Sequence, residues 1–450
     1  MTNTLFRKPA GRKGAFSFLG KTVQAACPAA GIRRQYVRHT FLVGVRFPGD
    51  SRFEARMEEL RGLTEACGAE VRGMADQKLP REDSAYFIGK GKVEEIRLTA
   101  DSLHADLVIF NNTLSPSQLT NLSEALELEV IDRTNLILNI FAERARSREA
   151  RMQVDYAKLK YMLPRLVGLR ANLSRQGGAS GSMSNRGAGE KKIELDRRRI
   201  EKRMALLRRS LDEIAKERET QRKRRARSGM PLISLVGYTN AGKSTLMNQM
   251  IRCCGTDDEK QVLEQDMLFA TLDTSVRQIA PSGRRPFLLS DTVGFIDDLP
   301  TGLVDAFRST LDEALHADLI LMIVDSTDPE YRNHIQVTEE TLAELGAGSI
   351  PVITVMNKND GIRPILEKDR ILMSAKDPDH LPALLDLIET KLNEGSLTCT
   401  LLIPYAQSRL ENVLRESGVV KSCEYTDDGI RITAAIRRDR IQQFQEYLQE

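Results

Sequence analysis

A glycine-rich segment near the middle of the chain has the residue types and spacing that bind phosphate groups. The apolar run Leu232–Val236 precedes it and predicts a buried strand, while Thr245–Asn248 follows it and predicts the start of a helix. A strand, a glycine-rich turn and a helix in this order are the structural context of a phosphate-binding loop. The segment itself reads Gly237-Tyr238-Thr239-Asn240-Ala241-Gly242-Lys243-Ser244.

Several residues of this loop have the chemistry that a nucleoside triphosphate requires. Gly237 and Gly242 allow the backbone to curl so that its amides face the phosphates. Lys243 is expected to reach the β- and γ-phosphates, and the Ser244 hydroxyl is expected to take one position around Mg²⁺. The sequence therefore predicts a triphosphate site with Mg²⁺ as the cofactor.

A threonine downstream of the loop stands where a first switch would close over the γ-phosphate. It is Thr271, in the segment Phe269-Ala270-Thr271-Leu272-Asp273. Its hydroxyl is expected to complete the Mg²⁺ shell. Threonines are common, so the interpretation depends on the position of this one between the phosphate-binding loop and the next motif.

That next motif is a D-x-x-G sequence, Asp291-Thr292-Val293-Gly294, which follows a strand predicted at Pro286–Ser290. Asp291 is expected to hold Mg²⁺ through a water, and the Gly294 amide is expected to sense the γ-phosphate. Phe295 comes next, where Ras-like enzymes have a glutamine that orients the attacking water. Because phenylalanine cannot bond to water, we expect slow turnover without outside stimulation. The candidate catalytic residues are Lys243, Thr271 and Gly294, and the candidate Mg²⁺ ligands are Ser244, Thr271 and Asp291.

Two further segments predict recognition of guanine. The strand expected at Pro351–Met356 ends in Asn357-Lys358-Asn359-Asp360. The Asp360 carboxylate can accept two guanine N–H groups and would repel adenine, which has an acceptor there. Asn357 can bind the other side of the ring, and the Lys358 stem can pack over its edge. Ser374-Ala375-Lys376, after the strand expected at Arg370–Met373, can offer a backbone amide to the guanine oxygen, so GTP is the predicted substrate.

The elements before the phosphate-binding loop predict a small parallel α/β domain. The expected strands are Phe41–Phe47, Ala105–Phe110 and Leu128–Ile131, and the expected helices are Ser51–Ala66, Lys92–Leu103 and Ser117–Leu126. Between them, the glycine- and lysine-rich segment Tyr86–Lys92 favours a tight turn, with an anion site at the following helix start as the alternative.

Two long helical patterns follow and predict an antiparallel hairpin. One apolar stripe is Met152, Tyr156, Leu159, Leu163 and Leu166, and the other is Ile193, Ile200, Met204, Leu207, Leu211 and Ile214. Pro164 is expected to kink or weaken the first helix. The glycine- and serine-rich connection Gln176–Glu190 is expected to have no regular structure. It is either a flexible linker or, given its basic flanks, a contact for RNA; those flanks carry Arg165, Arg170, Arg175, Arg186, Lys191, Lys192 and Arg197–Arg199.

The last part of the chain predicts a small α+β unit. Its expected elements are a strand at Leu401–Ile403, a helix at Gln407–Ser417, a hairpin of Val419–Tyr425 and Ile430–Ile436, and a final helix. In the second hairpin strand, apolar residues alternate with Arg431, Thr433 and Ala435, which indicates a sheet covered on one face. The predicted domains are a basic, disordered tail (1–40), the α/β domain (41–146), the hairpin (147–228), the GTPase domain (229–395) and the α+β domain (396–450).

Composition limits the remaining possibilities. No apolar run in the 450 residues approaches the roughly 20 that a membrane span needs. The six cysteines include no C-x-x-C pair and indicate thiols of a reducing cytoplasm, so we expect a cytoplasmic protein, and a monomer by default. Net charge is only +3, yet the first 49 residues have no Asp or Glu and Arg222–Arg227 is a second basic run. Such runs are solvated surface or contact nucleic acid, and an acid-free start is also typical of a transit peptide.

From about Phe41 to Glu450 the sequence resembles the HflX family of translation-associated GTPases, within the Obg–HflX group. The segments that carry the resemblance are Gly237–Ser244, Phe269–Asp273, Asp291–Phe295, Phe307-Arg308-Ser309-Thr310-Leu311, Asp132-Arg133-Thr134 and Arg186–Glu190. The resemblance implies GTP hydrolysis, binding to the large ribosomal subunit by the N-terminal domain and hairpin near the peptidyl-transferase region, and splitting of stress-stalled ribosomes. The loop Gly177–Ser184 looks longer and richer in serine than the family form, and the basic start lies outside the family pattern.

Two other classes of function compete with this interpretation. One is a GTP-controlled scaffold that docks a protein or membrane partner through the hairpin. The other is a nucleotide phosphatase with a small-molecule site in the N-terminal domain, where no catalytic or metal constellation is found in the sequence. Use of ATP by the N-terminal domain, and a role in ribosome splitting, dormancy or assembly, are left open by the sequence.

Overall fold

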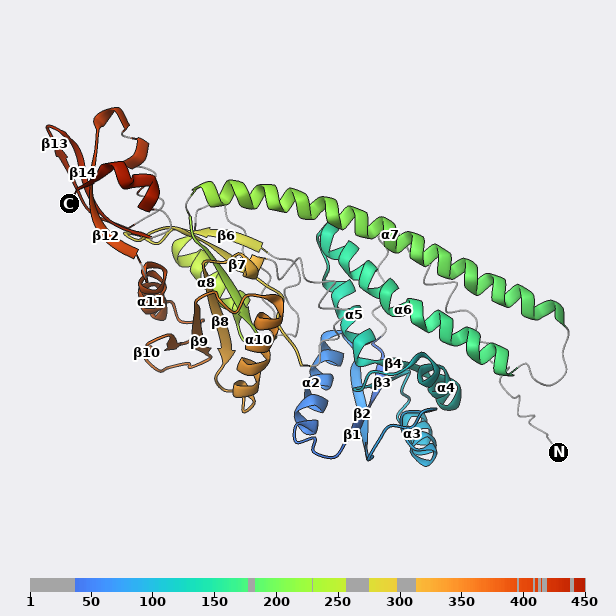
Figure 1. The fold of residues 1–450 in the computed structure, drawn as a ribbon. Coiled ribbons are helices and arrows are strands. Elements are labelled where there is room, and N and C mark those ends of the chain that lie inside the picture. Colours follow the sequence, from blue (N-terminus) through green and yellow to red (C-terminus); the bar gives the residue numbers. More distant parts are fainter. Residues whose placement is uncertain are drawn as a thin grey trace, which may run out of the picture. The chain divides into compact units, whose positions relative to one another are not determined.

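A computed structural model describes residues 37–176, 183–228, 230–255, 275–297, 313–394, 396–407, 409–411, 414, 419–437 and 441–449 (Figure 1). The strands in these residues form a four-stranded sheet, a seven-stranded sheet and a second four-stranded sheet. The basic segment before Val37, the proposed first switch Phe269–Asp273 and the motif Phe307–Leu311 lie outside the described residues.

The first sheet confirms the predicted parallel α/β architecture. Its strands pair in parallel in the order β2-β1-β3-β4. They are β1 (His39–Arg46), β2 (Glu70–Lys78), β3 (Leu107–Phe110) and β4 (Glu129–Asp132), and the helices are α2 (Phe53–Ala66), α3 (Lys90–Ser102), α4 (Pro116–Leu126) and α5 (Arg133–Arg144). The sequence analysis missed β2, because this edge strand alternates exposed and half-buried positions and has no apolar run.

The segment before α3 forms a tight turn. Asp83 and Phe87 form an isolated antiparallel bridge, and Phe87 has a positive φ of 65°. Gly89 is the N-cap residue of α3, in an extended conformation. The Gly89 amide donates to the Gln77 side chain at 3.0 Å, which ties the turn to β2.

The long helices α6 (Arg148–Gln176) and α7 (Met183–Ser228) pack against each other as predicted (Figure 1). A 2.6 Å ion pair between Glu149 at the start of α6 and Arg218 near the end of α7 shows that they are antiparallel. Leu207 is buried in the predicted stripe. The helix α6 continues through Pro164. Among the described residues, no helix combines the length and the apolar character that a bilayer crossing demands.

One expectation about the hairpin tip is wrong. We expected Gln176–Glu190 to lack regular structure. Residues 177–182 lie outside the described part of the chain, but Gln176 ends α6, and α7 begins at Met183 and includes Arg186–Glu190. A glycine inside a helix costs only about 1 kcal/mol relative to alanine. Extending an existing helix adds one hydrogen bond per residue. The charged segment after Glu190 therefore forms a helix that extends towards the N-terminus through the glycines.

Arg165 also differs from its predicted role as an RNA contact. Its guanidinium donates to the Asp132 carboxylate at 3.1 Å and to the carbonyls of Leu114 and Tyr161 at 3.2 and 2.8 Å. Asp132 is fully buried, caps α5 through the Asn135 amide at 2.9 Å, and accepts from the Tyr161 hydroxyl at 2.6 Å. Arg165 therefore neutralises a buried carboxylate and attaches α6 to the first sheet.

The seven-stranded sheet has the order β10-β11-β9-β8-β5-β7-β6, with antiparallel pairing of the outer strands β10 and β6. Its strands are β5 (Leu232–Gly237), β6 (Ser275–Ile279), β7 (Phe287–Asp291), β8 (Leu319–Asp325), β9 (Val352–Asn357), β10 (Ile365–Glu367) and β11 (Arg370–Leu372). The helices are α8 (Lys243–Cys254), α10 (Tyr331–Leu345) and α11 (Leu381–Asn393), with η1 (Pro378–His380) before α11. Because β5, β7, β8 and β9 are parallel, their carboxyl ends place the phosphate and guanine motifs at one edge.

The last sheet is antiparallel, in the order β13-β14-β12-β15. Its strands are β12 (Ser396–Ile403), β13 (Val419–Thr426), β14 (Gly429–Arg437) and β15 (Leu448–Gln449), with 3₁₀ turns η2 (Tyr405–Gln407) and η3 (Gln442–Tyr447). Ile430, Ile432, Ala434 and Ile436 are buried, which confirms the predicted one-sided cover. The expected final helix is instead η3 followed by β15, because pairing with Thr400 and Leu401 of β12 replaces helical hydrogen bonds. Of the expected helix Gln407–Ser417, the described part is helical at Arg409–Glu411 and Leu414.

The buried carboxylate of Asp132 generates a stability prediction. Asp132→Ala should lower the free energy of unfolding by about 3 kcal/mol, because it leaves Arg165 and Tyr161 without their shared acceptor and removes the cap of α5. Urea denaturation followed by circular dichroism measures this. The control Glu124→Ala, at an exposed position of α4, should change stability by no more than about 0.5 kcal/mol. Equal stability of the two variants would contradict the assignment.

Candidate nucleotide-binding site

The loop between β5 and α8 has the backbone geometry of a phosphate cradle. Gly237 and Gly242 have φ values of 142° and 97°, which side chains rarely adopt. A Cβ on Gly237 would lie 2.1 Å from the Ile323 carbonyl oxygen, and one on Gly242 would lie 2.2 Å from the Asn357 side-chain nitrogen. Both positions therefore require glycine, for space as well as for conformation.

Lys243 points back into this loop. Its ammonium is buried and donates to the carbonyls of Gly237 at 3.0 Å and Tyr238 at 2.7 Å. Burial lowers the pKa of Lys243 to about 8, and the negative charge of Asp291 partly opposes this shift. An ammonium has three donors, so the two carbonyls leave one for a phosphate oxygen, and a phosphate would favour the charged form.

Ser244 and Asp291 lie together at the carboxyl edge of the sheet. The Ser244 hydroxyl donates to an Asp291 carboxylate oxygen at 2.9 Å, and Asp291 is fully buried at the end of β7. A hydroxyl and a carboxylate oxygen are hard ligands of the kind that Mg²⁺ prefers. In the adjacent loop, the Thr239 hydroxyl is buried and has no hydrogen-bond partner among the described residues, which fits a site for an anionic oxygen.

The D-x-x-G segment lies directly against the phosphate-binding loop. The Phe295 amide donates to the Gly237 carbonyl at 3.1 Å, and the Phe295 carbonyl accepts from the Thr239 amide at 2.8 Å. A Cβ on Gly294 would lie 2.9 Å from the Lys243 nitrogen. Phe295 itself is buried in the hydrophobic core, so its ring packs inward and offers no polar group to a water.

The guanine motif is tied to the phosphate-binding loop by one buried amide. Asn357 donates from its side chain to the Ala241 carbonyl and accepts from the Ala375 amide, both at 2.8 Å. One N–H of Asn357 and one lone pair of its oxygen are thus used within the protein, and the other N–H and lone pair stay available for the predicted contact with the ring. Asn357 also joins the loop to Ser374-Ala375-Lys376, a role that the sequence analysis did not foresee.

The remaining residues of the motif are held by neighbouring loops. Asp360 accepts from the Ser374 hydroxyl at 2.5 Å. Lys358 pairs with Asp325, at the end of β8, at 2.7 Å, and Asn359 donates to the Ser326 hydroxyl at 2.8 Å. Asp325 was not singled out from the sequence, although a charged residue that ends a buried strand is a recognisable signal.

Tyr238 has contacts outside the phosphate site that the sequence analysis also missed. Its hydroxyl donates to Glu59 of α2 and accepts from the Asp297 amide at 2.8 Å. Its ring stacks on His334 of α10, with 3.8 Å between centroids and 12° between planes. Burial, followed by the charges of Glu59 and Asp297, raises the pKa of Tyr238, so the hydroxyl stays protonated.

Family models of GTP-binding proteins match most of this chain. Three family models match the chain: GTP-binding GTPase N-terminal over residues 54–142, GTP-binding GTPase middle region over residues 144–225, and 50S ribosome-binding GTPase over residues 232–358. The model over residues 232–358 spans the phosphate-binding loop, the D-x-x-G motif and the first two residues of the guanine motif, Asn357 and Lys358.

Relatives that carry the name GTPase HflX are similar over nearly their whole length. The protein of Caldanaerobacter subterraneus is 44% identical over 397 residues, which is 87% of this chain and 90% of the relative. That of Alkalihalophilus pseudofirmus is 41% identical over 402 residues, which is 88% of this chain and 92% of the relative. A crystal structure of a GTP-binding protein from Sulfolobus solfataricus in complex with GDP is 25% identical, with a TM-score of 0.42 over 80% of this chain and 99% of that one.

The bond between Ser374 and Asp360 generates a prediction for nucleotide affinity. Ser374→Ala should weaken GDP binding roughly threefold to tenfold, because a hydrogen bond that orients a charged group contributes about 1 kcal/mol. Titration with a fluorescent GDP analogue measures this. The control Thr390→Ala, which removes a hydroxyl bonded to the Asp386 carbonyl on α11, should leave GDP affinity unchanged. Undiminished affinity in Ser374→Ala would show that Asp360 does not depend on this bond.

Proposed function

The chain belongs to the HflX family of GTPases, and we propose that it hydrolyses GTP at the edge of the seven-stranded sheet and associates with the large ribosomal subunit. The main support is that residues 232–358, which carry the phosphate-binding loop and the D-x-x-G segment, match the family model described as 50S ribosome-binding GTPase. Under this proposal the bound nucleotide controls affinity for the ribosome, and the protein acts on stalled or stressed ribosomes.

The phosphate chemistry follows from the contacts of the loop. Lys243 binds the β- and γ-phosphates with the donor that its two carbonyl partners leave. Ser244 and Asp291, with Thr271 from outside the described residues, would hold Mg²⁺, which neutralises charge on the phosphates. The Gly294 amide binds the γ-phosphate, for which the absence of a side chain gives the close approach.

The guanine base is expected to bind at the loop after β9. Asp360 accepts two N–H groups of the base, and its orientation is set by Ser374. Asn357 binds the other side of the ring, and its bonds to the Ala241 carbonyl and the Ala375 amide fix its orientation. Lys358 packs along the base edge while its ammonium pairs with Asp325.

Slow intrinsic turnover is part of the proposal. Phe295 is buried and cannot orient water, so another group, from this chain or from the ribosome, must do so. Stimulation by the ribosome is therefore the expected mode of regulation.

The ribosome contact is assigned to the hairpin and the N-terminal sheet. Arg198 and Arg199 on α7 have side chains 71% and 77% exposed and pair only weakly with Glu194 and Asp196 on their own helix. Exposed arginines with such partners can exchange them for phosphates of RNA. The alternative, a GTP-controlled scaffold for a protein or membrane partner, would use the same helix as a docking element.

Loss of the loop lysine tests the hydrolytic site. Lys243→Ala should reduce GTP hydrolysis on the order of a hundredfold or more, because it removes the charge that stabilises the transferring phosphate. Phosphate release under single-turnover conditions measures this. Lys368→Ala, at an exposed position, is the control and should retain activity. Near-normal turnover in folded Lys243→Ala would place the active site elsewhere.

A change at the base-binding carboxylate tests nucleotide identity. Asp360→Asn should weaken GTP binding about tenfold or more and shift preference towards xanthosine triphosphate, whose additional carbonyl can accept from the new amide. Competition between the two nucleotides measures this. Asp379→Asn, an exposed aspartate of η1, should keep the original preference. Unchanged affinities for both nucleotides would contradict the guanine assignment.

Co-sedimentation with ribosomes in GDP, GTP and a non-hydrolysable GTP analogue tests the proposed partner. Binding should depend on the nucleotide, and the double variant Arg198→Ala, Arg199→Ala should flatten the log–log salt dependence by about one to two units if both contact phosphates. The control is the double variant Lys368→Ala, Arg370→Ala. It removes the same amount of positive charge at two exposed positions where the chain turns from β10 into β11. Absence of sedimentation in all three nucleotide states would favour the scaffold, and an unchanged slope would show that this face of α7 is only solvated.

A further inference from the structure

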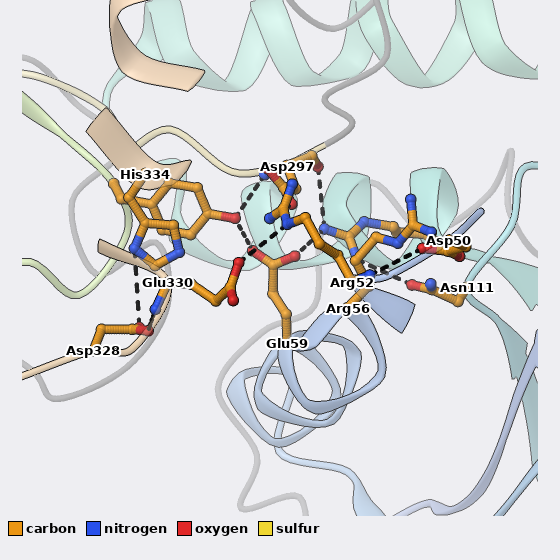
Figure 2. Close-up of polar contacts among 11 residues, drawn as sticks. Asp50, Arg52, Arg56, Glu59, Asn111, Asp297, Asp328, Glu330 and His334 are labelled. Atoms are coloured by element: carbon orange, nitrogen blue, oxygen red, sulfur yellow. Dashed lines mark hydrogen bonds and ion pairs between the residues drawn. The ribbon is translucent and has the colours of Figure 1, made fainter. Parts of the chain in front are cut away.

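Asp297 is the residue at which the segment after the D-x-x-G motif meets the first sheet. Its side chain is only 6% exposed, and its carboxylate pairs with the guanidinium of Arg52 (Figure 2). Its carbonyl accepts from Arg133 at 3.1 Å, and its amide donates to the Tyr238 hydroxyl at 2.8 Å. All three polar groups of this residue are bound, two of them by arginines of the N-terminal elements.

The arginines hold Asp297 at the carboxyl edge of the first sheet. The strands β1 and β3 are neighbours although β2 lies between them in sequence, so the strand order reverses between them. Open α/β sheets bind small ligands in the crevice at such a reversal. Asn111 directly follows β3 and accepts from Arg133 at 3.0 Å, while Arg133 directly follows β4. The sheet therefore uses its ligand-binding position to hold a residue of its own chain.

Glu59 brings the phosphate-binding loop into the same network. Its carboxylate accepts from the Tyr238 hydroxyl and, at 2.5 Å, from Arg133. Arg52 also pairs with Glu330, next to α10, at 3.2 Å. The N-terminal elements thus bind the phosphate-binding loop through Tyr238 and the segment after the D-x-x-G motif through Asp297.

These contacts matter because the D-x-x-G segment leaves little space next to the Lys243 ammonium. A Cβ on Gly294 would already lie 2.9 Å from the Lys243 nitrogen and 2.9 Å from the Thr239 Cα. A γ-phosphate oxygen bound by both Lys243 and the Gly294 amide must fit between them, so the position of the segment decides how much room GTP has. Asp297 lies three residues further on, and its three bonds oppose any withdrawal of the segment.

We propose that Arg52 and Arg133 are positioning residues that hold Asp297 and so keep the D-x-x-G segment in an arrangement that favours GDP over GTP. This inference rests on the phosphate site proposed above. Coupling between two binding events is reciprocal. GTP therefore weakens the hold of the first sheet on Asp297 by the same factor by which that hold weakens GTP binding.

The test is the ratio of the dissociation constants for guanylyl imidodiphosphate and GDP in the full-length chain. Arg52→Ala and Asp297→Asn should each lower this ratio about fivefold or more. The double variant should lower it no further, because both changes remove the same interaction. Arg52→Lys, which keeps the positive charge, should retain most of the wild-type ratio. Arg61→Ala, whose partner Glu58 lies on the same helix at 3.6 Å, is the matched control and should leave the ratio unchanged.

A ratio within about twofold of wild type in both single variants would overturn the inference, as would a rise in the ratio or additive effects in the double variant. Arg52 is 32% exposed, and Asp297→Asn preserves side-chain volume, so thermal denaturation without nucleotide is expected to show folded variants. Loss of hydrolysis in Lys243→Ala with unchanged ratios in the Arg52 and Asp297 variants would refute this inference and leave the phosphate site standing. Full activity in Lys243→Ala would refute both.

Discussion

The buried ammonium of Lys243 is the constraint on which the described part of the phosphate site depends. A charge removed from water needs polar partners, and here the carbonyls of Gly237 and Tyr238 turn inward to supply them. That turn needs a positive φ at Gly237, where the nearby Ile323 carbonyl also excludes any side chain. The same ammonium lies so near Gly294 that a side chain there would collide with it. The buried charge of Lys243 therefore accounts for glycine at two positions, Gly237 in the phosphate-binding loop and Gly294 in the D-x-x-G motif.

The loops around this charge have little regular structure, so side-chain bonds must fix them. Asn357 joins the phosphate-binding loop to the segment that follows β11, and it fills the space that a side chain at position 242 would need. Tyr238 binds the other side of the loop to Glu59 and to the Asp297 amide. The guanine motif is thus joined to the phosphate-binding loop through a buried amide, and the loop is joined to helix α2 through a buried hydroxyl.

The phosphate and guanine motifs were predictable because each follows a buried apolar strand, and parallel strands bring their carboxyl ends to one edge. Pairings between distant residues were not. Arg165 looked like an RNA contact because its partner Asp132 lies 33 residues away and no local pattern links them. Asp297 gave no signal, since Arg52 is 245 residues away. The edge strand β2 lacks an apolar run, and the glycines near the start of α7 suggested a loop where helix propagation prevailed.

Two consecutive residues connect the segment after the D-x-x-G motif to the middle of α6 in the hairpin. Asp132 accepts from Tyr161 and Arg165 of α6, at 2.6 and 3.1 Å, and Arg133 binds the Asp297 carbonyl and Glu59. Asp132 also caps α5, so the backbone that carries both side chains is fixed at the start of a helix. A displacement of Arg133 that follows Asp297 would therefore act on the same helix start that anchors α6. The hairpin that we propose to bind RNA is attached to the first sheet at Asp132, and the next residue, Arg133, binds the segment after the D-x-x-G motif. A movement of that segment on nucleotide binding would therefore be transmitted to the hairpin through two adjacent residues.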